Sequence, residues 1–274
     1  WMQAMTMVLA ATLGHAADGP IVAPILERAI LENLAKPQGK LAEADLAKVT
    51  ELDLSFTKIT DAGLGEIAKL PQLERVYLNG TQITDDGLNA VVRLPRLHTL
   101  NLWHARITDA GLKDLAKCAK LRSLDLSRTR ITDAGLRDLV KLQQLTQLWL
   151  HNTRITDASL GEVAKLQQLT FLGLVGTEIT DASLAQVAKL PRLTGLGLSW
   201  TEITDAGIQE IVKLQQLKVL SLTETKITDV GLRDLAKLPR LTEVYLHRTR
   251  ITAAVVAEFQ KARPNCKIFT RFTE

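Results

Sequence analysis

A repeat with a period of 24 residues constrains the fold of this chain more than any other feature of its sequence. Such a period is typical of a solenoid, in which each unit buries its apolar face only against its neighbours. We number positions 1 to 24 within each unit from the apolar residue that opens it. The nine opening residues follow one another without insertion: Val49, Leu73, Leu97, Leu121, Leu145, Leu169, Leu193, Leu217 and Leu241.

Each unit predicts one short strand followed by one short helix. Positions 4 and 6, such as Leu124 and Leu126, are apolar with variable residues between them, which is the pattern of a strand with one buried face. Position 12 is Thr in every unit, and Asp follows it in eight of the nine. Because Thr caps the free N–H groups of a helix and Asp complements the helix dipole, a helix is expected to begin there.

The consensus of the units resembles that of leucine-rich repeats. Residues 121–144 follow the pattern L-x-x-L-x-L-x-x-T-x-I-T-D-A-G-L-x-x-L-x-K-L-x-x. Its I-T-D-A-G-L block is most similar to the cysteine-containing branch of that family, with Thr at position 9 where Asn or Cys usually stands. The resemblance covers about four-fifths of the chain. It implies an α/β fold: a curved solenoid of nine 24-residue repeats, with a parallel sheet on the concave side and short helices on the convex side.

The sequence divides into four expected segments. Residues 1–17 are interpreted as the remnant of a secretory signal peptide, which predicts a periplasmic or secreted protein; a weakly packed N-terminal arm is the alternative. Residues 18–48 are expected to form a helical N-terminal cap, which resembles that of bacterial internalin-like proteins. Residues 49–264 hold the nine leucine-rich repeats, and residues 265–274 are expected to form a C-terminal capping strand, because a solenoid exposes its core at both ends.

Composition and charge argue against a membrane-spanning segment and against a nucleic-acid partner. The longest uncharged apolar run, residues 5–13, would rise only about 14 Å as a helix, against roughly 30 Å for a bilayer core. We therefore expect no transmembrane segment. Lys and Arg number 34 against 30 Asp and Glu, and a net charge of +4 is too small to indicate nucleic acid.

The chain also lacks the short motifs of common enzymes. It contains no G-x-S-x-G, no phosphate-binding glycine loop, no C-x-x-C and no H-E-x-x-H. His104 and His151 lie two units apart, so a shared metal would need a third group such as Asp125 between them. We expect no enzyme, no metal site and no cofactor.

The aromatic residues of the repeats are placed on the surface. Positions 3, 5 and 7 point away from the core on the concave side, and position 8 lies at its edge. Seven of the eight aromatic residues in the units occupy these positions, whereas only Phe259 falls in a helix. An exposed aromatic cluster on a rigid scaffold indicates recognition. The predicted partner-binding residues are Tyr77, Trp103, His104, Trp149, His151, Phe171, Gly173, Gly195, Gly197, Trp200, Tyr245 and His247.

Three glycines lie together at the centre of the predicted concave face. Gly173, Gly195 and Gly197 leave two neighbouring strands without side chains, between Trp149 and Phe171 on one side and Tyr245 on the other. Because Gly disfavours strands, we interpret them as the floor of a pocket with aromatic walls. The alternative is that they relieve crowding on a curved sheet.

Charge gathers at position 10, where the predicted strands end. The charged rim expected there consists of Arg106, Arg130 and Arg154, followed by Glu178 and Glu202, and Arg128 at position 8 lies beside it. Like charges about 5 Å apart are tolerated on a solvated edge, and they also suit an acidic partner; both interpretations stay open. The change of sign along the rim would orient such a partner.

These observations favour a non-enzymatic module that binds a protein or peptide through its aromatic-rich concave face. Three alternatives remain at this stage. The sequence is also compatible with a structural or assembly subunit of a larger complex, with a carbohydrate-binding repeat protein, and with an intracellular adaptor like the ubiquitin-ligase members of the family that share this repeat subtype. No recognisable recruitment domain precedes Val49, which counts against the adaptor.

Overall fold

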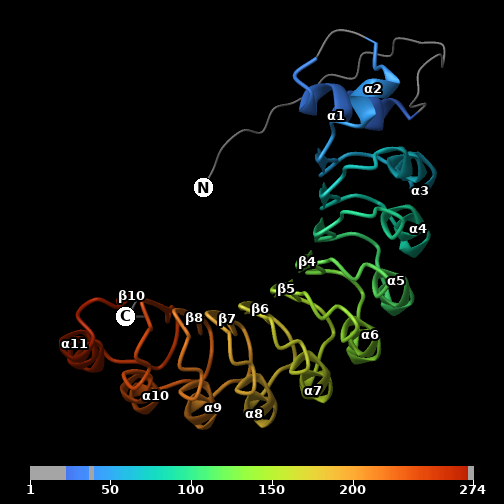
Figure 1. Ribbon diagram of the computed structural model, residues 1–274. Helices are drawn as coiled ribbons and strands as arrows, with labels where there is room; N and C mark the ends of the chain where they lie inside the picture. The colour runs from blue at the N-terminus through green and yellow to red at the C-terminus, as the bar shows by residue number, and fades with distance from the viewer. Residues whose placement is uncertain (1–22, 37–39, 271–274) are drawn as a thin grey trace.

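A computed structural model describes residues 23–36 and 40–270 of the chain. The predicted signal-peptide remnant, residues 1–17, lies outside these described residues. Figure 1 shows the strands along the inner edge of a curved solenoid and the helices along its outer edge. This arrangement confirms the predicted solenoid with a parallel concave sheet.

Ten parallel strands form one sheet in chain order within the described residues. Each strand pairs with the strand 24 residues further on, so that Leu148 lies opposite Leu172. The period of the sequence is therefore the register of the sheet. The strands are β1 (Glu51–Asp53), β2 (Arg75–Tyr77), β3 (Thr99–Asn101), β4 (Ser123–Asp125), β5 (Gln147–Trp149), β6 (Phe171–Gly173), β7 (Gly195–Gly197), β8 (Val219–Ser221), β9 (Glu243–Tyr245) and β10 (Lys267–Phe269).

The helices are short, and several begin with a 3-10 turn. The α-helices are α1 (Pro24–Asn33), α2 (Glu43–Leu46), α3 (Asp61–Leu64), α4 (Leu88–Val91), α5 (Asp109–Leu115), α6 (Asp133–Leu139), α7 (Leu160–Val163), α8 (Leu184–Val187), α9 (Asp205–Ile211), α10 (Asp229–Leu235) and α11 (Ala253–Ala262). The 3-10 helices are η1 (Gly65–Lys69), η2 (Asp85–Gly87), η3 (Asp157–Ser159) and η4 (Asp181–Ser183). None of the helices in the described ranges is long and apolar enough to cross a membrane.

The core follows the predicted strand phase. Positions 4 and 6 point inward in each unit, and both Leu148 and Leu150 of the fifth unit are fully buried. The Thr column at position 9 satisfies backbone groups beside this core, since Thr153 Oγ1 donates a hydrogen bond of 2.6 Å to the carbonyl of Leu150. Thr at this position therefore closes the turn after the strand.

An Asp–Thr pair links each unit to the next. Asp133 Oδ1 accepts the N–H of Thr156 at 2.9 Å, and Asp133 Oδ2 accepts its hydroxyl at 2.6 Å. The sequence predicts only that Asp serves its own helix; the structure adds a second role between units. A Cβ at Gly135 would lie 2.5 Å from Asp109 Oδ1, so the glycine of the I-T-D-A-G-L block leaves room for the carboxylate. The same pair joins Asp61–Thr84, Asp85–Thr108, Asp109–Thr132, Asp157–Thr180, Asp181–Thr204, Asp205–Thr228 and Asp229–Thr252.

The chain turns sharply at position 8, where it leaves each strand. Trp200 has a φ of 59° there, and His104 also has a φ of 59°. The turn lets the N–H of Trp200 donate to the carbonyl of Thr223 in the next unit at 2.8 Å. Left-handed backbone costs a non-glycine residue roughly 1–2 kcal/mol, and the stacked hydrogen bonds offset it. Side chains at position 8 are thus fixed on the rim of the concave face.

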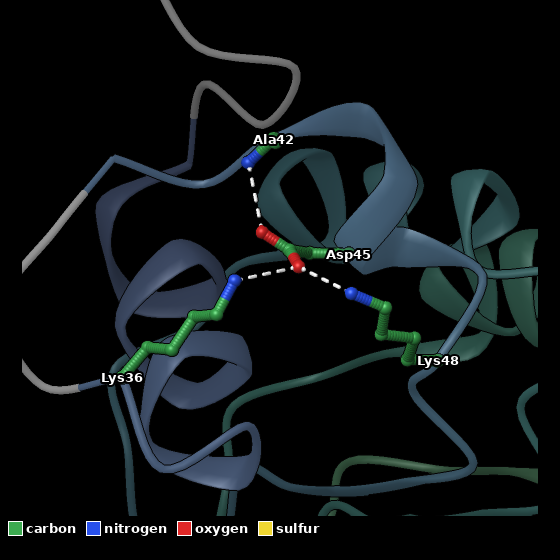
Figure 2. Close-up of polar contacts among 4 residues, drawn as sticks. All are labelled: Lys36, Ala42, Asp45 and Lys48. Atoms are coloured by element: carbon green, nitrogen blue, oxygen red, sulfur yellow. Dashed lines mark hydrogen bonds and ion pairs between the residues drawn. The ribbon is translucent and has the colours of Figure 1, made fainter.

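A buried carboxylate organises the N-terminal end. Asp45 of α2 is only 2% exposed, and it accepts hydrogen bonds from Lys36 Nζ at 2.7 Å, Lys48 Nζ at 3.1 Å and the N–H of Ala42 at 3.2 Å. Figure 2 shows the two ammonium groups converging on one carboxylate oxygen. These partners hold the pKa of Asp45 well below its usual range. The network ties the end of α1 to α2.

Candidate functional site

The central part of the concave face carries a pair of aromatic rings. Trp149 ends β5 and Phe171 begins β6, and both point to the water side because their neighbours Leu148 and Leu172 point inward. Their ring centroids lie 5.1 Å apart with an interplanar angle of 35°. Both side chains are half-buried, so each presents part of its ring to solvent.

The predicted glycine floor is not an open pocket, and that expectation is wrong. A Cβ at Gly173 would lie 2.7 Å from His151 Nε2, and one at Gly195 would lie 2.7 Å from Phe171 Cδ2. The rings of His151 and Phe171 therefore cover the glycines of the next strand. Gly197 lies beside them, and a Cβ there would meet Val175 Cγ2 at an ordinary 3.4 Å. The glycines make room for the chain's own rings, which is the crowding alternative.

His151 is held as a neutral ring. Its Nδ1 accepts the N–H of Val175 at 3.0 Å, so the proton of the neutral imidazole is assigned to Nε2. Burial lowers the pKa of His151, and the nearby charge of Asp125 opposes this effect only in part. The backbone N–H of His151 donates to Ser127 Oγ at 3.2 Å. Side chains at position 7 thus accept hydrogen bonds from the backbone of the next unit, which fixes the central cluster.

A second aromatic pair lies at the C-terminal end of the sheet. Tyr245 stacks on Phe269 with centroids 4.5 Å apart and an interplanar angle of 8°. Phe269 is absent from the predicted site, although counting 24 residues from Tyr245 leads to it. The Tyr245 hydroxyl donates to Glu243 Oε2 at 3.0 Å, and this carboxylate raises the pKa of Tyr245. His247 Nδ1 is buried and has no hydrogen-bond partner among the described residues.

A third cluster surrounds Trp103 near the N-terminal end. The Phe56 ring lies 6.1 Å from the Trp103 ring, the His104 ring lies 5.3 Å from it, and the Arg128 guanidinium lies 5.5 Å from its centroid. A Cβ at Gly80 would lie 2.5 Å from Phe56 Cδ1, so the Phe56 ring reaches over this glycine. Phe56 is 72% exposed, which makes it part of a surface that the predicted residue set does not include.

The structure separates the remaining predicted residues. Trp200 is 58% exposed on the rim, and Tyr77 is half-buried at the end of β2. The ring contacts of the described residues join neither of them to the central pair. The aromatic surface therefore comprises separate clusters along one concave side.

The charged rim has two different halves. Arg106, Arg130 and Arg154 are exposed and form no ion pair with the described residues. Further along, Glu202 pairs with Lys226, and Glu224 pairs with Arg248 at 2.8 Å. Glu178 is exposed between the two halves. A surface hollow of about 360 Å³ opens in the first half, lined by Gly80, Thr81, Gln82, His104, Ala105, Arg106, Arg128 and Arg130.

The convex side shows a different use of charge. Lys141 pairs with Asp138 at 2.8 Å, and Lys165 pairs with Glu162 at 2.7 Å, each across one helical turn. The lysines of the convex side are thus largely paired within their own units.

In residues 23–36 and 40–270, no three His, Cys, Asp or Glu side chains gather in a group able to hold a metal ion.

Comparison with known families agrees with the repeat architecture. A family model described as a leucine-rich repeat region matches residues 107–263, more than half of the chain, and a second leucine-rich repeat model matches residues 46–68 and 95–116. The chain belongs to the leucine-rich repeat family. The matches do not distinguish the cysteine-containing branch, which stays a prediction.

The fold is similar to that of a solved internalin. Internalin C2 from Listeria monocytogenes is 23% identical over 95% of this chain and 100% of that chain, with a TM-score of 0.54. An internalin named inlF from the same organism is 20% identical over 93% of this chain and 96% of that chain, with a TM-score of 0.46. A search of curated proteins found no match.

Proposed function

We propose that this leucine-rich repeat protein is a non-enzymatic module that binds a protein or peptide through its concave face, with Trp149 and Phe171 as the central anchor. One observation carries the proposal: two large rings, 5.1 Å apart, lie half-buried on the water side of a sheet whose core is built mainly of Leu, Ile and Val. Packing of the core does not require them there. Aromatic residues held this way are typical binding hot spots.

The surroundings of the pair favour tight recognition. Phe171 is held against Gly195, and His151 against Gly173, so these rings have little freedom to lose when a partner binds. His151 keeps one polar N–H beside the apolar surface. A rigid apolar patch with a few polar groups suits a peptide segment that presents an apolar side chain. The proposal includes an exported location, which rests on the sequence of residues 1–17 alone.

Selection from a random-peptide library displayed on phage tests this function. Peptides that bind the immobilised wild-type protein are synthesised, and calorimetry measures their affinity for variants. Trp149→Ala should weaken binding about 30-fold, which corresponds to about 2 kcal/mol. The control Lys141→Ala removes an exposed convex charge and should change affinity by less than about 0.5 kcal/mol. Thermal melting verifies that both variants fold.

Two outcomes would contradict the proposal. The first is a set of peptides that binds Trp149→Ala as tightly as wild type but loses affinity for Lys141→Ala, because the binding face would then be convex. The second is a failure to select any peptide, together with Trp149-dependent binding on an array of oligosaccharides. That result would make the protein a carbohydrate-binding repeat protein.

A further inference from the structure

The first half of the charged rim holds positive charge that no other described residue neutralises. We define the arginine rim as Arg106, Arg128 and Arg130, which line one hollow of about 360 Å³. None of the three forms an ion pair with another described residue. Where position 10 carries both signs, by contrast, neighbouring units pair them, as Glu202 and Lys226 do.

The backbone fixes these arginines at successive steps of the stack. The N–H of Arg106 donates to the carbonyl of Ile83, and the N–H of Arg130 donates to the carbonyl of Ile107, both at 2.9 Å. Because stacked strands repeat at about 4.8 Å, the two side chains start from points that are one step apart. Such a row of like charges repels itself, and an anionic partner would relieve this repulsion.

Arg128 is positioned by two further features. Its φ of 56° directs its side chain onto the rim, and its guanidinium lies 5.5 Å from the centre of the Trp103 ring. This cation–π contact orients the guanidinium without using up its hydrogen-bond donors. Gly80, with a φ of 68°, adds no side chain to the lining of the hollow. The hollow is therefore open between guanidinium groups that keep free donors.

We infer that the arginine rim binds an acidic segment of a protein partner, with Asp or Glu carboxylates entering the hollow. Guanidinium groups bind carboxylates through paired, charge-assisted hydrogen bonds, and Trp103 with Phe56 offers an apolar surface beside them. Exposed Glu178 further along the rim repels the same segment, so the acidic residues lie over the third and fourth units. The inference deepens the proposed function by naming the chemistry of the partner.

A short synthetic peptide that alternates Glu and Gly, compared with its Gln-for-Glu counterpart, tests this site by calorimetry at low and physiological ionic strength. The wild-type protein should bind the Glu peptide more tightly, and salt should weaken that binding. The triple variant Arg106→Gln, Arg128→Gln, Arg130→Gln should weaken it about tenfold or more. The matched control Arg93→Gln, Arg96→Gln, Arg137→Gln removes the same charge from exposed arginines away from the rim and should change binding by less than about twofold.

Three results would overturn the inference. Equal weakening by both triple variants would indicate attraction by net charge. Equal affinity for the Glu and Gln peptides would exclude recognition of acidic side chains. Binding of inorganic phosphate or heparin that depends on the arginine rim, without binding of the Glu peptide, would mean that the rim binds a different class of anion. The Trp149→Ala variant separates the two proposals, because it should retain the Glu peptide while it loses the peptides selected from the library. If only the predictions for the arginine rim fail, the proposed binding through Trp149 and Phe171 is unaffected.

Discussion

Two positions of each repeat differ in how much their residue type varies: position 13, which links one unit to the next, and position 5, which lies on the concave strands. At position 13, eight consecutive units carry the same Asp, and each accepts hydrogen bonds from the Thr of the following unit, as Asp133 does from Thr156. At position 5 of the concave strands, by contrast, Trp149 is followed by Gly173 and Gly197. The Asp that makes the same link to the next unit recurs, whereas the concave strand positions that face water vary. The varied side is thus where specific binding can arise.

The largest expected effect tests the framework. Leu150→Ala should destabilise the protein by about 2–5 kcal/mol, because the fully buried Leu150 has a stacked unit on each side and its loss leaves a cavity. Leu174→Ala should behave alike. Denaturant melts measure the change. A loss below about 1 kcal/mol would show that the core tolerates a hole at this position.

The second prediction breaks one link of the Asp–Thr ladder. Asp133→Ala removes the acceptor for the N–H and hydroxyl of Thr156 and should cost about 1.5–3 kcal/mol in denaturant melts. The matched variant Asp229→Ala breaks the last link, to the exposed Thr252, where water can replace the lost bonds. It should cost less. Equal losses at the two positions would mean that the ladder stabilises each helix separately and does not join units.

This ladder illustrates what the sequence predicts and what it does not. The period follows from comparing the units, strand phase and helix start follow from residues within one unit, and the structure confirms all three. The link from Asp133 to Thr156 spans 23 residues, so a single unit does not reveal it. One signal was available: the last unit carries Ala253 at the Asp position, and only β10 follows its helix α11 in the described residues.

The central cluster was harder to predict for a different reason. Alternation along a strand places Trp149 and Phe171 on the concave face, as the sequence indicates. It does not say whether a ring stands upright or lies across the next strand. Phe171 lies across Gly195, which closes the predicted floor. Side-chain packing between strands decides this choice, and a repeat pattern carries no information about it.

The third prediction compares two glycines of the covered floor. Gly173→Ala should destabilise the protein by about 1–2 kcal/mol, because its Cβ would displace the His151 ring. Gly197→Ala should stay within about 1 kcal/mol of wild type, since its Cβ meets Val175 at an ordinary distance and Ala restricts the unfolded chain. Thermal or denaturant melts of both variants measure the difference. The reverse order would place the His151 ring away from Gly173.

The smallest expected effect concerns pH and His151. Burial holds its pKa below the ordinary 6.5, so between those two values the unfolded chain binds a proton that the folded chain does not. The resulting stability is fully present above pH 6.5 and is lost as the pH falls toward the folded pKa. Protonation would also place a proton on Nδ1, which accepts the Val175 N–H. Between about pH 7.5 and about pH 5, the melting temperature should therefore fall further for wild type than for His151→Gln, in which this titration is absent. The comparison of the two proteins removes the contribution of the ionisable groups that both contain. A wild-type decrease no larger than that of His151→Gln would mean that the central cluster accepts a charged ring, and the neutral, hydrogen-bonded state assigned to His151 would then be incorrect.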